Sequence, residues 1–277
     1  MTSSATSNSG GGSILDRIFA AKRAELDARR AAVPLAALQS QAHRASAPRD
    51  FLAALRARRP AVIAEIKRAS PSKGDILTGL DPAAVAADYE ASGAAAISVL
   101  TDRHFKGSLE DLRTVRAAVK LPLLRKDFIF DPYQLHEARA AGADCVLLIA
   151  AMLKEDELRT LYQLARELGL QALVEVHNAG EMRTAERVGA ELIGINNRDL
   201  HTFVTDLAVT ERLLADYRGG ALVVAESGIN APADIRRLDR AGARAFLIGE
   251  SLLRGGNPRA RLAELCAALD HRADRES

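Results

Sequence analysis

The sequence has 277 residues, of which 48% are hydrophobic and only 4% aromatic, and its formal net charge at pH 7 is +2. This length allows one large domain or two small ones with a sizeable core. The even mixture of acidic and basic residues argues against a nucleic-acid surface, which would show a basic stripe. No apolar run approaches the roughly 20 residues that a membrane helix needs, so we expect no membrane association.

The N-terminal residues 1–13, MTSSATSNSGGGS, are rich in Ser and Gly and lack the charged and apolar regions of a signal peptide. We therefore predict a disordered tail. The two cysteines, Cys145 and Cys266, have no CxxC or His partner spacing, and the six histidines form no HxxxH or HExxH pair. These patterns predict neither a disulfide framework nor a metal site, and they favour a soluble cytoplasmic protein.

A helical extension is predicted over residues 14–59. Ser13 is a suitable N-cap for a helix over 14–33, which has a partial apolar stripe of Leu15, Ile18, Phe19 and Leu26 and is ended by Pro34. A second helix is expected over Pro48–Arg58. Two roles for this extension are open: it closes one end of the domain that follows, or it forms part of that domain's active-site rim.

Eight short apolar segments recur along the rest of the chain, with centres roughly 20–33 residues apart, the length of a βα unit. We interpret them as strands over 61–67, 95–100, 121–127, 144–150, 171–176, 191–196, 221–227 and 244–250. Helix-like stretches separate them, such as 81–94, which begins with Asp81 as N-cap and Pro82 at the first position. The pattern predicts a (β/α)8 barrel over residues 60–272. The alternative is an open doubly wound sheet, which usually carries a GxGxxG or GxxxxGK[ST] loop, and neither motif is present.

Polar residues interrupt the apolar segments at their C-terminal ends, where barrel enzymes carry their chemistry. These residues are Glu65, Lys67, Lys126, Glu175, Asn196, Arg198 and Glu226. Buried charges are costly unless they are paired, so a ring of acids and bases at one mouth must be mutually compensated. We interpret the ring as a site for proton transfer. The alternative is an ion-pair network that only seals the end of the barrel.

Two glycine turns follow the seventh and eighth strands. Ser227 and Gly228 stand in the first turn, and Gly249 and Glu250 stand in the second. Backbone N–H groups of these two loops form the usual phosphate site of a barrel. The turns therefore predict a phosphorylated small molecule as substrate, with Lys67 or the basic loop around Lys73 adding positive charge.

Several stretches together carry a resemblance to a known family. AEIKRASPSKG, ISVLTDRHFKGSLEDL, LPLLRKDFIFDPYQ, LVEVHN, IGINNRDL, AESGI and FLIGESLL occur in order between residues 61 and 254. They resemble the successive signatures of indole-3-glycerol phosphate synthase. The resemblance implies a (β/α)8 barrel with an N-terminal helical extension, without metal or organic cofactor. It also implies ring closure of 1-(2-carboxyphenylamino)-1-deoxy-D-ribulose 5-phosphate, with release of CO2 and water, in tryptophan biosynthesis.

The resemblance also implies roles for the polar ring. Lys126 would be the general acid that protonates the substrate carbonyl during ring closure, and Glu175 would be the acid–base partner in the later dehydration. Lys67 would hold the anthranilate carboxylate and donate a proton when water leaves. The remaining members of the ring would orient these groups and stabilise developing charge; they are Glu65, Asn196, Arg198 and Glu226.

Further residues match the family's substrate site. An apolar wall for the aromatic ring is expected from Phe105, Phe128, Leu147, Leu200 and Phe203, for which the alternative is an ordinary core role. The phosphate turns are Ser227, Gly228, Gly249 and Glu250, the last through its backbone N–H, and Ser70 is also counted with the substrate-binding residues.

Two other functions stay open for the sequence: a non-catalytic phosphosugar-binding barrel and another phosphosugar isomerase. A binding module has no need for Lys126 and Glu175 on different strands facing one space. The expected partner is the phosphorylated anthranilate–ribulose substrate, and the sequence identifies no protein partner.

Overall fold

The structure, a computed structural model, describes residues 14–70, 74–75, 79–200, 202–254 and 256–269. The predicted tail over residues 1–13 lies outside the described residues, and so do Lys73 and the side chain of Ser70. The apolar stripe predicted for the first helix is described only at Leu26, which is buried.

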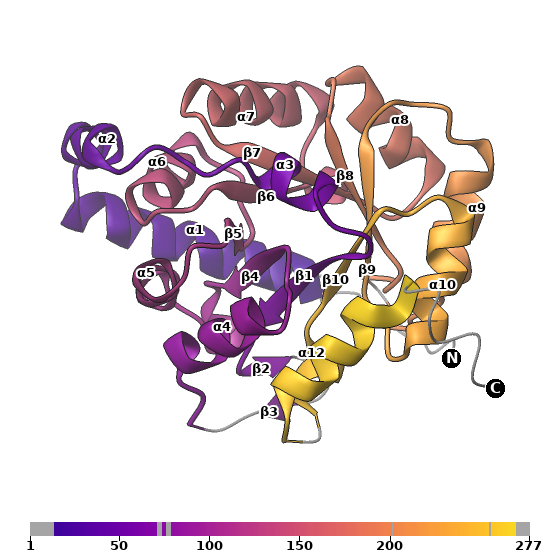
Figure 1. The fold of residues 1–277 in the computed structure, drawn as a ribbon. Coiled ribbons are helices and arrows are strands. Elements are labelled where there is room, and N and C mark those ends of the chain that lie inside the picture. Colours follow the sequence, from indigo (N-terminus) through magenta and orange to yellow (C-terminus); the bar gives the residue numbers. More distant parts are fainter. Residues whose placement is uncertain (1–13, 71–73, 76–78, 201, 255, 270–277) are drawn as a thin grey trace, which may run out of the picture.

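Eight parallel strands form a closed barrel at the centre of the molecule (Figure 1). They are β1 (Ala61–Ile66), β4 (Ala96–Leu100), β5 (Leu123–Lys126), β6 (Cys145–Ile149), β7 (Gln171–Val176), β8 (Leu192–Asn196), β9 (Leu222–Glu226) and β10 (Ala245–Ile248). β1 pairs with β4 on one side and with β10 on the other, which closes the sheet. The predicted barrel is confirmed, and the open doubly wound alternative is wrong.

Helices follow the strands and surround the barrel (Figure 1). They are α4 (Pro82–Ala91), α5 (Leu109–Ala118), α6 (Pro132–Ala140), α7 (Glu155–Glu167), α8 (Ala179–Arg187), α9 (Ala208–Asp216), α10 (Pro232–Ala241), α11 (Glu250–Leu253) and α12 (Pro258–Cys266). Single 3-10 turns lie at η1 (Arg103–Phe105), η2 (Ala150–Met152) and η3 (Ala267–Leu269), and a small hairpin joins β2 (Ala69–Ser70) to β3 (Gly74–Asp75). The Asp81 carboxylate accepts from the Ala83 amide, as a predicted N-cap should.

The core has two layers because successive strand residues point to opposite faces. In β1, Val62 and Ala64 face the surrounding helices, whereas Ala61 and Ile63 face the barrel interior. Continuing this alternation, Glu65 comes next on the interior side. The apolar interior therefore ends in a charged residue at the mouth, where the C-terminal ends of the strands meet.

Three helices precede β1: α1 (Ile14–Ala32), α2 (Leu35–Arg44) and α3 (Phe51–Arg56). The first ends before Pro34, as predicted, and the second predicted helix is confirmed in a shorter form. The sequence analysis missed α2, which buries only Leu38 and Ala42 and packs on α6, so its apolar signal is weak. α3 inserts Phe51 into the interior apolar cluster and so fills the end of the barrel opposite the charged mouth.

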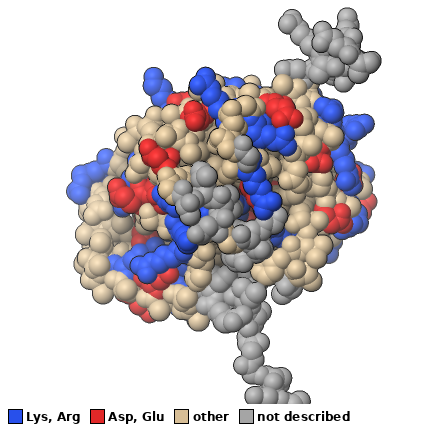
Figure 2. Space-filling model, turned by 90° about the horizontal axis from the view of Figure 1, so that it is seen from below, with Lys and Arg blue, Asp and Glu red and all other residues tan. Residues whose placement is uncertain are grey.

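The surface bears both signs of charge. On the face shown in Figure 2, Lys and Arg side chains alternate with Asp and Glu side chains, and no stripe of one sign crosses it. In the part of the chain that the structure describes, no helix combines the length and the apolar character needed to span a bilayer.

Candidate active site

A cavity of about 300 Å³ opens at the C-terminal ends of the strands. Every site residue predicted from the sequence lines this cavity except Ser70, whose side chain lies outside the described residues. The structure therefore brings together side chains from β1, β5, β7, β8 and β9 that are far apart in the sequence. Their chemical roles remain predictions.

Lys126 at the end of β5 contacts two carboxylates from other strands. Its Nζ lies 3.1 Å from Glu175 Oε2 on β7 and 3.6 Å from Glu226 Oε2 on β9. Burial by itself would lower the pKa of Lys126, but the negative charges of Glu175, Glu226 and Glu65 outweigh it and raise that pKa above its ordinary value. At neutral pH the amine is therefore a charged ammonium group.

Glu175 is held as an ionised carboxylate. Its Oε1 accepts a hydrogen bond from Asn196 Nδ2 at 3.1 Å. Burial acts to raise the pKa of Glu175, but Lys126, His177 and the Asn196 hydrogen bond outweigh burial and hold the pKa below its ordinary value. The side chain is thus a charged hydrogen-bond acceptor at neutral pH.

Glu226 behaves in the opposite way. Burial and the neighbouring charge of Glu175 raise its pKa to about 8, against a smaller lowering by Lys126. The raised pKa of Glu226 and the lowered pKa of Glu175 therefore separate the two carboxyl groups of the site. Carboxyl groups with separated pKa values in one site are typical of acid–base catalysis.

Two glycines make room for the buried carboxylates. A Cβ added to Gly194 in β8 would overlap Glu226 Oε1, and a Cβ added to Gly249 would lie 2.5 Å from Glu65 Oε1. Neither glycine has a positive φ angle, so the space and not the backbone conformation requires glycine there. The barrel interior is therefore shaped around these carboxylates.

Glu65 and Lys67 form the second ion pair of the mouth. Lys67 Nζ lies 2.7 Å from Glu65 Oε1, and the two side chains are only 15% and 6% exposed. Their spacing of two residues along the chain puts both on the cavity side. β1 thus contributes its own carboxylate and its own ammonium group, on a different strand from the Lys126 pair.

The turns after β9 and β10 lie next to each other. Ser227 and Gly228 have φ angles of 64° and 80°, a left-handed conformation that is uncommon for a residue other than glycine. Ser251 Oγ donates to the Ile229 carbonyl at 2.9 Å and ties the two turns together. Successive backbone N–H groups in such a conformation form a concave anion site.

The carboxylate of Glu250 is turned to arginines. Its Oε1 lies 2.9 Å from Arg254 Nη2 and its Oε2 lies 3.8 Å from Arg198 Nη2. This arrangement agrees with the expectation that Glu250 offers its backbone N–H to a phosphate, since its negative charge is balanced by two cations.

The predicted apolar wall is partly exposed to the cavity. Phe105, Phe128, Leu200 and Phe203 are half-buried cavity-lining residues, whereas Leu147 is buried in the interior apolar cluster. Leu147 also lines the cavity, from deeper in the barrel. The half-buried side chains give the cavity an apolar lining against which an aromatic ring can pack.

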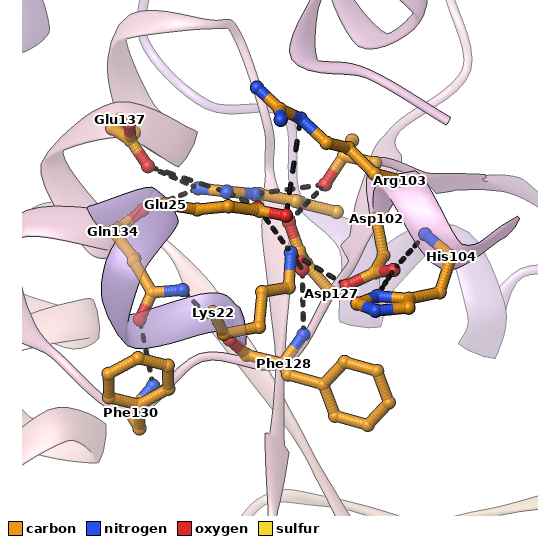
Figure 3. A network of polar contacts seen from close by, with 12 residues as sticks. Lys22, Glu25, Asp102, Arg103, His104, Asp127, Phe128, Phe130, Gln134 and Glu137 are labelled. Carbon is orange, nitrogen blue, oxygen red and sulfur yellow. Dashed lines mark hydrogen bonds and ion pairs between the residues drawn. The ribbon is translucent and has the colours of Figure 1, made fainter. Parts of the chain in front are cut away.

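A lysine from the N-terminal extension reaches the same end of the barrel (Figure 3). Lys22 on α1 is 1% exposed, and its Nζ lies 2.7 Å from Asp102 Oδ2 and 2.6 Å from Asp127 Oδ1. Asp127 also accepts from Arg125 Nη2 at 3.0 Å and from Thr101 Oγ1 at 2.7 Å. Burial would raise the pKa of Asp127, but Arg125 and Lys22 outweigh it and lower that pKa to about 2.

Asp127 stands between Lys126 and Phe128, so this cluster fixes the end of β5. As the alternation along β5 predicts, Arg125 and Asp127 point away from the cavity centre, and Asp127 Oδ1 accepts from the Phe128 amide at 2.9 Å. The sequence analysis missed Lys22. Its position four residues after Ile18 and four before Leu26, in the apolar stripe, was the available signal.

Replacing Lys22 with Met is expected to destabilise the fold by about 3–5 kcal/mol, because it leaves two buried aspartates without this cation. We also expect a higher KM, since the Lys126–Phe128 segment loses its anchor to α1. Chemical denaturation and steady-state kinetics measure both effects. The matched control is Arg23→Met on the exposed face of α1. Equal unfolding free energies and KM values for the two variants would contradict a role of Lys22 in holding this segment.

Among the residues that the structure describes, no group of three or more His, Cys, Asp or Glu side chains is arranged to hold a metal ion. The groups at the mouth instead pair acids with bases.

Residues 15–265 match the family model described as indole-3-glycerol phosphate synthase. The chain is 48% identical to indole-3-glycerol phosphate synthase of Mycolicibacterium gilvum over 263 residues, which cover 95% of this chain and 97% of that relative. It is 53% identical to the protein of the same name from a Nocardioides species over 247 residues (89% and 95% covered). For the one from Chromobacterium violaceum, the identity is 49% over 257 residues (91% and 97% covered).

Among solved structures, thiamine phosphate pyrophosphorylase from Pyrococcus furiosus is similar, with a TM-score of 0.56 and 18% identity. The match covers 75% of this chain and 94% of that one. At this low identity the likeness shows the fold alone, a barrel of the same kind.

Proposed function

The chain belongs to the indole-3-glycerol phosphate synthase family, and we propose that Lys126 and Glu175 carry the acid and base steps of its reaction. The enzyme is a carbon–carbon lyase of tryptophan biosynthesis that closes a ring on a phosphorylated anthranilate-derived ribulose and releases CO2. The observation that carries the proposal is the 3.1 Å contact between Lys126 Nζ and Glu175 Oε2, from two strands, inside the cavity.

Ring closure is the step that needs an acid. The aromatic carbon that bears the carboxylate attacks the ribulose carbonyl, and the carbonyl oxygen gains negative charge as the new bond forms. A charged Lys126 ammonium provides a proton and electrostatic stabilisation at that oxygen. The attacking ring becomes positively charged, and loss of CO2 then returns the electron pair that restores aromaticity.

Dehydration is the step that needs a base. An ionised Glu175 removes the proton from the carbon next to nitrogen, and the former carbonyl oxygen leaves as water after a second protonation. In this proposal Lys67 binds the carboxylate of the substrate and supplies that proton, while Glu65, Asn196, Arg198 and Glu226 orient the reacting groups. Glu175 gains a proton in this step and lies 3.1 Å from Lys126, to which it can return that proton, and Lys67, paired with Glu65, regains its proton from solvent.

We propose the turns at Gly228 and Gly249 as the phosphate site, so Gly228→Ala should raise KM at least tenfold with a smaller effect on kcat. The left-handed φ of Gly228 strains any L side chain, and an added Cβ would lie 2.6 Å from Thr205 Cγ2. Steady-state kinetics measure the effect. The control is Gly220→Ala, where nothing lies within 4 Å of the added Cβ. Equal KM values in the two variants would contradict the proposal that these turns bind the phosphate.

Formation of the indole product is the test of the proposed chemistry. The purified enzyme is mixed with the substrate, and near-ultraviolet fluorescence of the indole is followed with release of CO2. We expect one equivalent of each per turnover. Binding without turnover would favour the non-catalytic phosphosugar-binding barrel, and a product that keeps its carboxylate would favour an isomerase.

We also propose the division of the chain into a helical extension over residues 14–59 and a catalytic barrel over 60–272. The distribution of contacts supports it, because α3 fills one end of the barrel and α1 reaches the other. We propose the cytoplasm as the compartment, supported by the two free cysteines Cys145 and Cys266. Substrate recognition in this account needs no nucleic acid and no membrane.

A further inference from the structure

A histidine that the proposed mechanism does not use lies beside Glu175, outside the cavity lining. His177 follows β7, two residues after Glu175, and its side chain is 13% exposed. Its Nε2 lies 3.3 Å from Glu175 Oε1, and its Nδ1 lies 3.1 Å from Glu181 Oε2 at the start of α8. The imidazole thus bridges a cavity carboxylate and a carboxylate outside the cavity.

Glu181 is fixed as an acceptor. Its Oε2 accepts from the His177 backbone amide at 2.7 Å, and its Oε1 accepts from Asn178 Nδ2 at 2.5 Å. The Glu181 amide in turn donates to Asn178 Oδ1 at 3.0 Å, which caps α8. Because the Glu181 carboxylate cannot donate, Nδ1 of the imidazole must carry a hydrogen. A neutral imidazole would then have no hydrogen on Nε2, the atom 3.3 Å from Glu175 Oε1.

That geometry favours the cation. A cationic imidazole forms an ion pair with Glu175, whose Oε1 lies 3.3 Å from Nε2, although Nε2 makes no aligned hydrogen bond there. A neutral imidazole would leave the two carboxylates without this counter-charge in a buried site. Burial would lower the pKa of His177, but Glu175 and Glu181 outweigh it and raise that pKa to about 10. The contacts and the raised pKa thus both indicate a cationic His177 at neutral pH.

We propose that His177, held by Glu181, is a positioning residue that keeps Glu175 ionised and oriented for its work as a base. This inference rests on the proposed role of Glu175. Other groups face Glu175 as well: Lys126 from β5, Asn196 from β8 and Glu226 from β9. Of these, Lys126 is a cation that acts on the substrate, so it cannot serve as a constant counter-charge throughout the cycle. His177 lies outside the cavity lining, beside the Glu175 carboxylate, and can therefore be a counter-charge throughout the cycle.

The signal for this pair is present in the sequence. Glu175 and His177 alternate onto the same side at the end of a strand, and Glu181 follows His177 by four residues, the spacing of one helical turn. The sequence analysis quoted LVEVHN only as a family signature and did not consider the histidine. Its significance depends on the distance to Glu175, which only the fold provides.

The first test measures the charge on His177 directly. The imidazole carbon–proton resonances of the wild-type protein are followed from pH 5 to 10.5 by NMR, with His177→Gln identifying the signal. We expect His177 to remain cationic through pH 8, and Glu181→Gln to lower its midpoint by more than one pH unit. The matched control is Glu186→Gln on the exposed face of α8, which should leave the midpoint unchanged. A wild-type midpoint near 6.5 would overturn the proposal.

The second test separates positioning from a purely structural role. His177→Gln keeps a polar group of similar reach but loses the charge, so kcat should fall at least tenfold at all pH values with KM changed less than about twofold. Glu181→Gln should resemble the wild type at pH 6, where His177 is still protonated, and resemble His177→Gln at pH 9. The kcat of each variant is divided by the wild-type kcat at the same pH, which removes the effect that titration of Glu226 and Lys126 has on kcat.

The two readouts distinguish the possible failures. The kcat of Glu181→Gln is divided by the wild-type kcat at the same pH. If this ratio were equal at pH 6 and pH 9, the positioning role would be overturned, even if NMR showed a cationic His177. If the wild-type enzyme formed no indole product, the proposed function would fail, and the NMR midpoints would still decide the charge state of His177.

Discussion

Replacing Lys126 with Met is expected to lower kcat by about 10²–10⁴-fold, the usual contribution of general acid catalysis, with further loss from missing charge stabilisation. Met keeps the length and the apolar stem of lysine but has no proton to give to the carbonyl oxygen. The phosphate turns are untouched, so KM should change only a few-fold. Fluorescence of the indole product measures the rate.

The matched control for this variant is Lys120→Met, which removes an exposed lysine between α5 and β5. Circular dichroism and thermal unfolding show whether both variants keep the fold. In the Lys126→Met protein, the His177 cation remains 3.3 Å from Glu175 Oε1 as a counter-charge for that carboxylate. A kcat near that of Lys120→Met in a folded Lys126→Met protein would show that another group is the acid.

Replacing Glu175 with Gln is expected to lower kcat by a similar factor, about 10²–10⁴-fold, because the amide cannot take the proton that dehydration releases. The variant should still close the ring, so an intermediate that has lost CO2 but not water should accumulate in a single turnover. Rapid quenching followed by mass spectrometry detects that species by its mass.

Glu167→Gln, at an exposed position near the end of α7, is the control for this change. Its rate and its intermediates should match those of the wild type. Glu175→Gln would contradict the account in two ways: by retaining a normal kcat, or by stalling before CO2 is released, which would place Glu175 in ring closure.

Much of the barrel could be predicted because its signal is local and periodic. Strands such as β7 and β8 are short β-branched runs bounded by helix caps and glycines, and their structural limits agree with the prediction at nearly every residue. The gathering of Lys126, Glu175 and Glu226 also followed from sequence, since barrel topology sends the C-terminal end of every strand to one mouth.

Other features depend on contacts that the sequence does not reveal. α2 was missed because two buried residues in ten form no clear amphipathic pattern, and its stability comes from packing on α6. Lys22 was missed although it lies in the predicted apolar stripe, because the aspartates that it reaches are 80 and 105 positions away. The pKa of Lys126 could not be assigned either, because burial and three carboxylates oppose each other and their distances decide the outcome.

The arrangement of the cavity is the central claim, and a crystal structure with indole-3-glycerol phosphate bound tests it most directly. We predict the phosphate within hydrogen-bond distance of the backbone N–H groups of Gly228 and of the turn that begins at Gly249. The indole should lie against Phe128, and the ring carbon that carries the glycerol chain should lie between Lys126 Nζ and Glu175. A product whose ring lies outside the cavity, or whose glycerol and ring atoms are beyond about 4 Å from both side chains, would contradict the account.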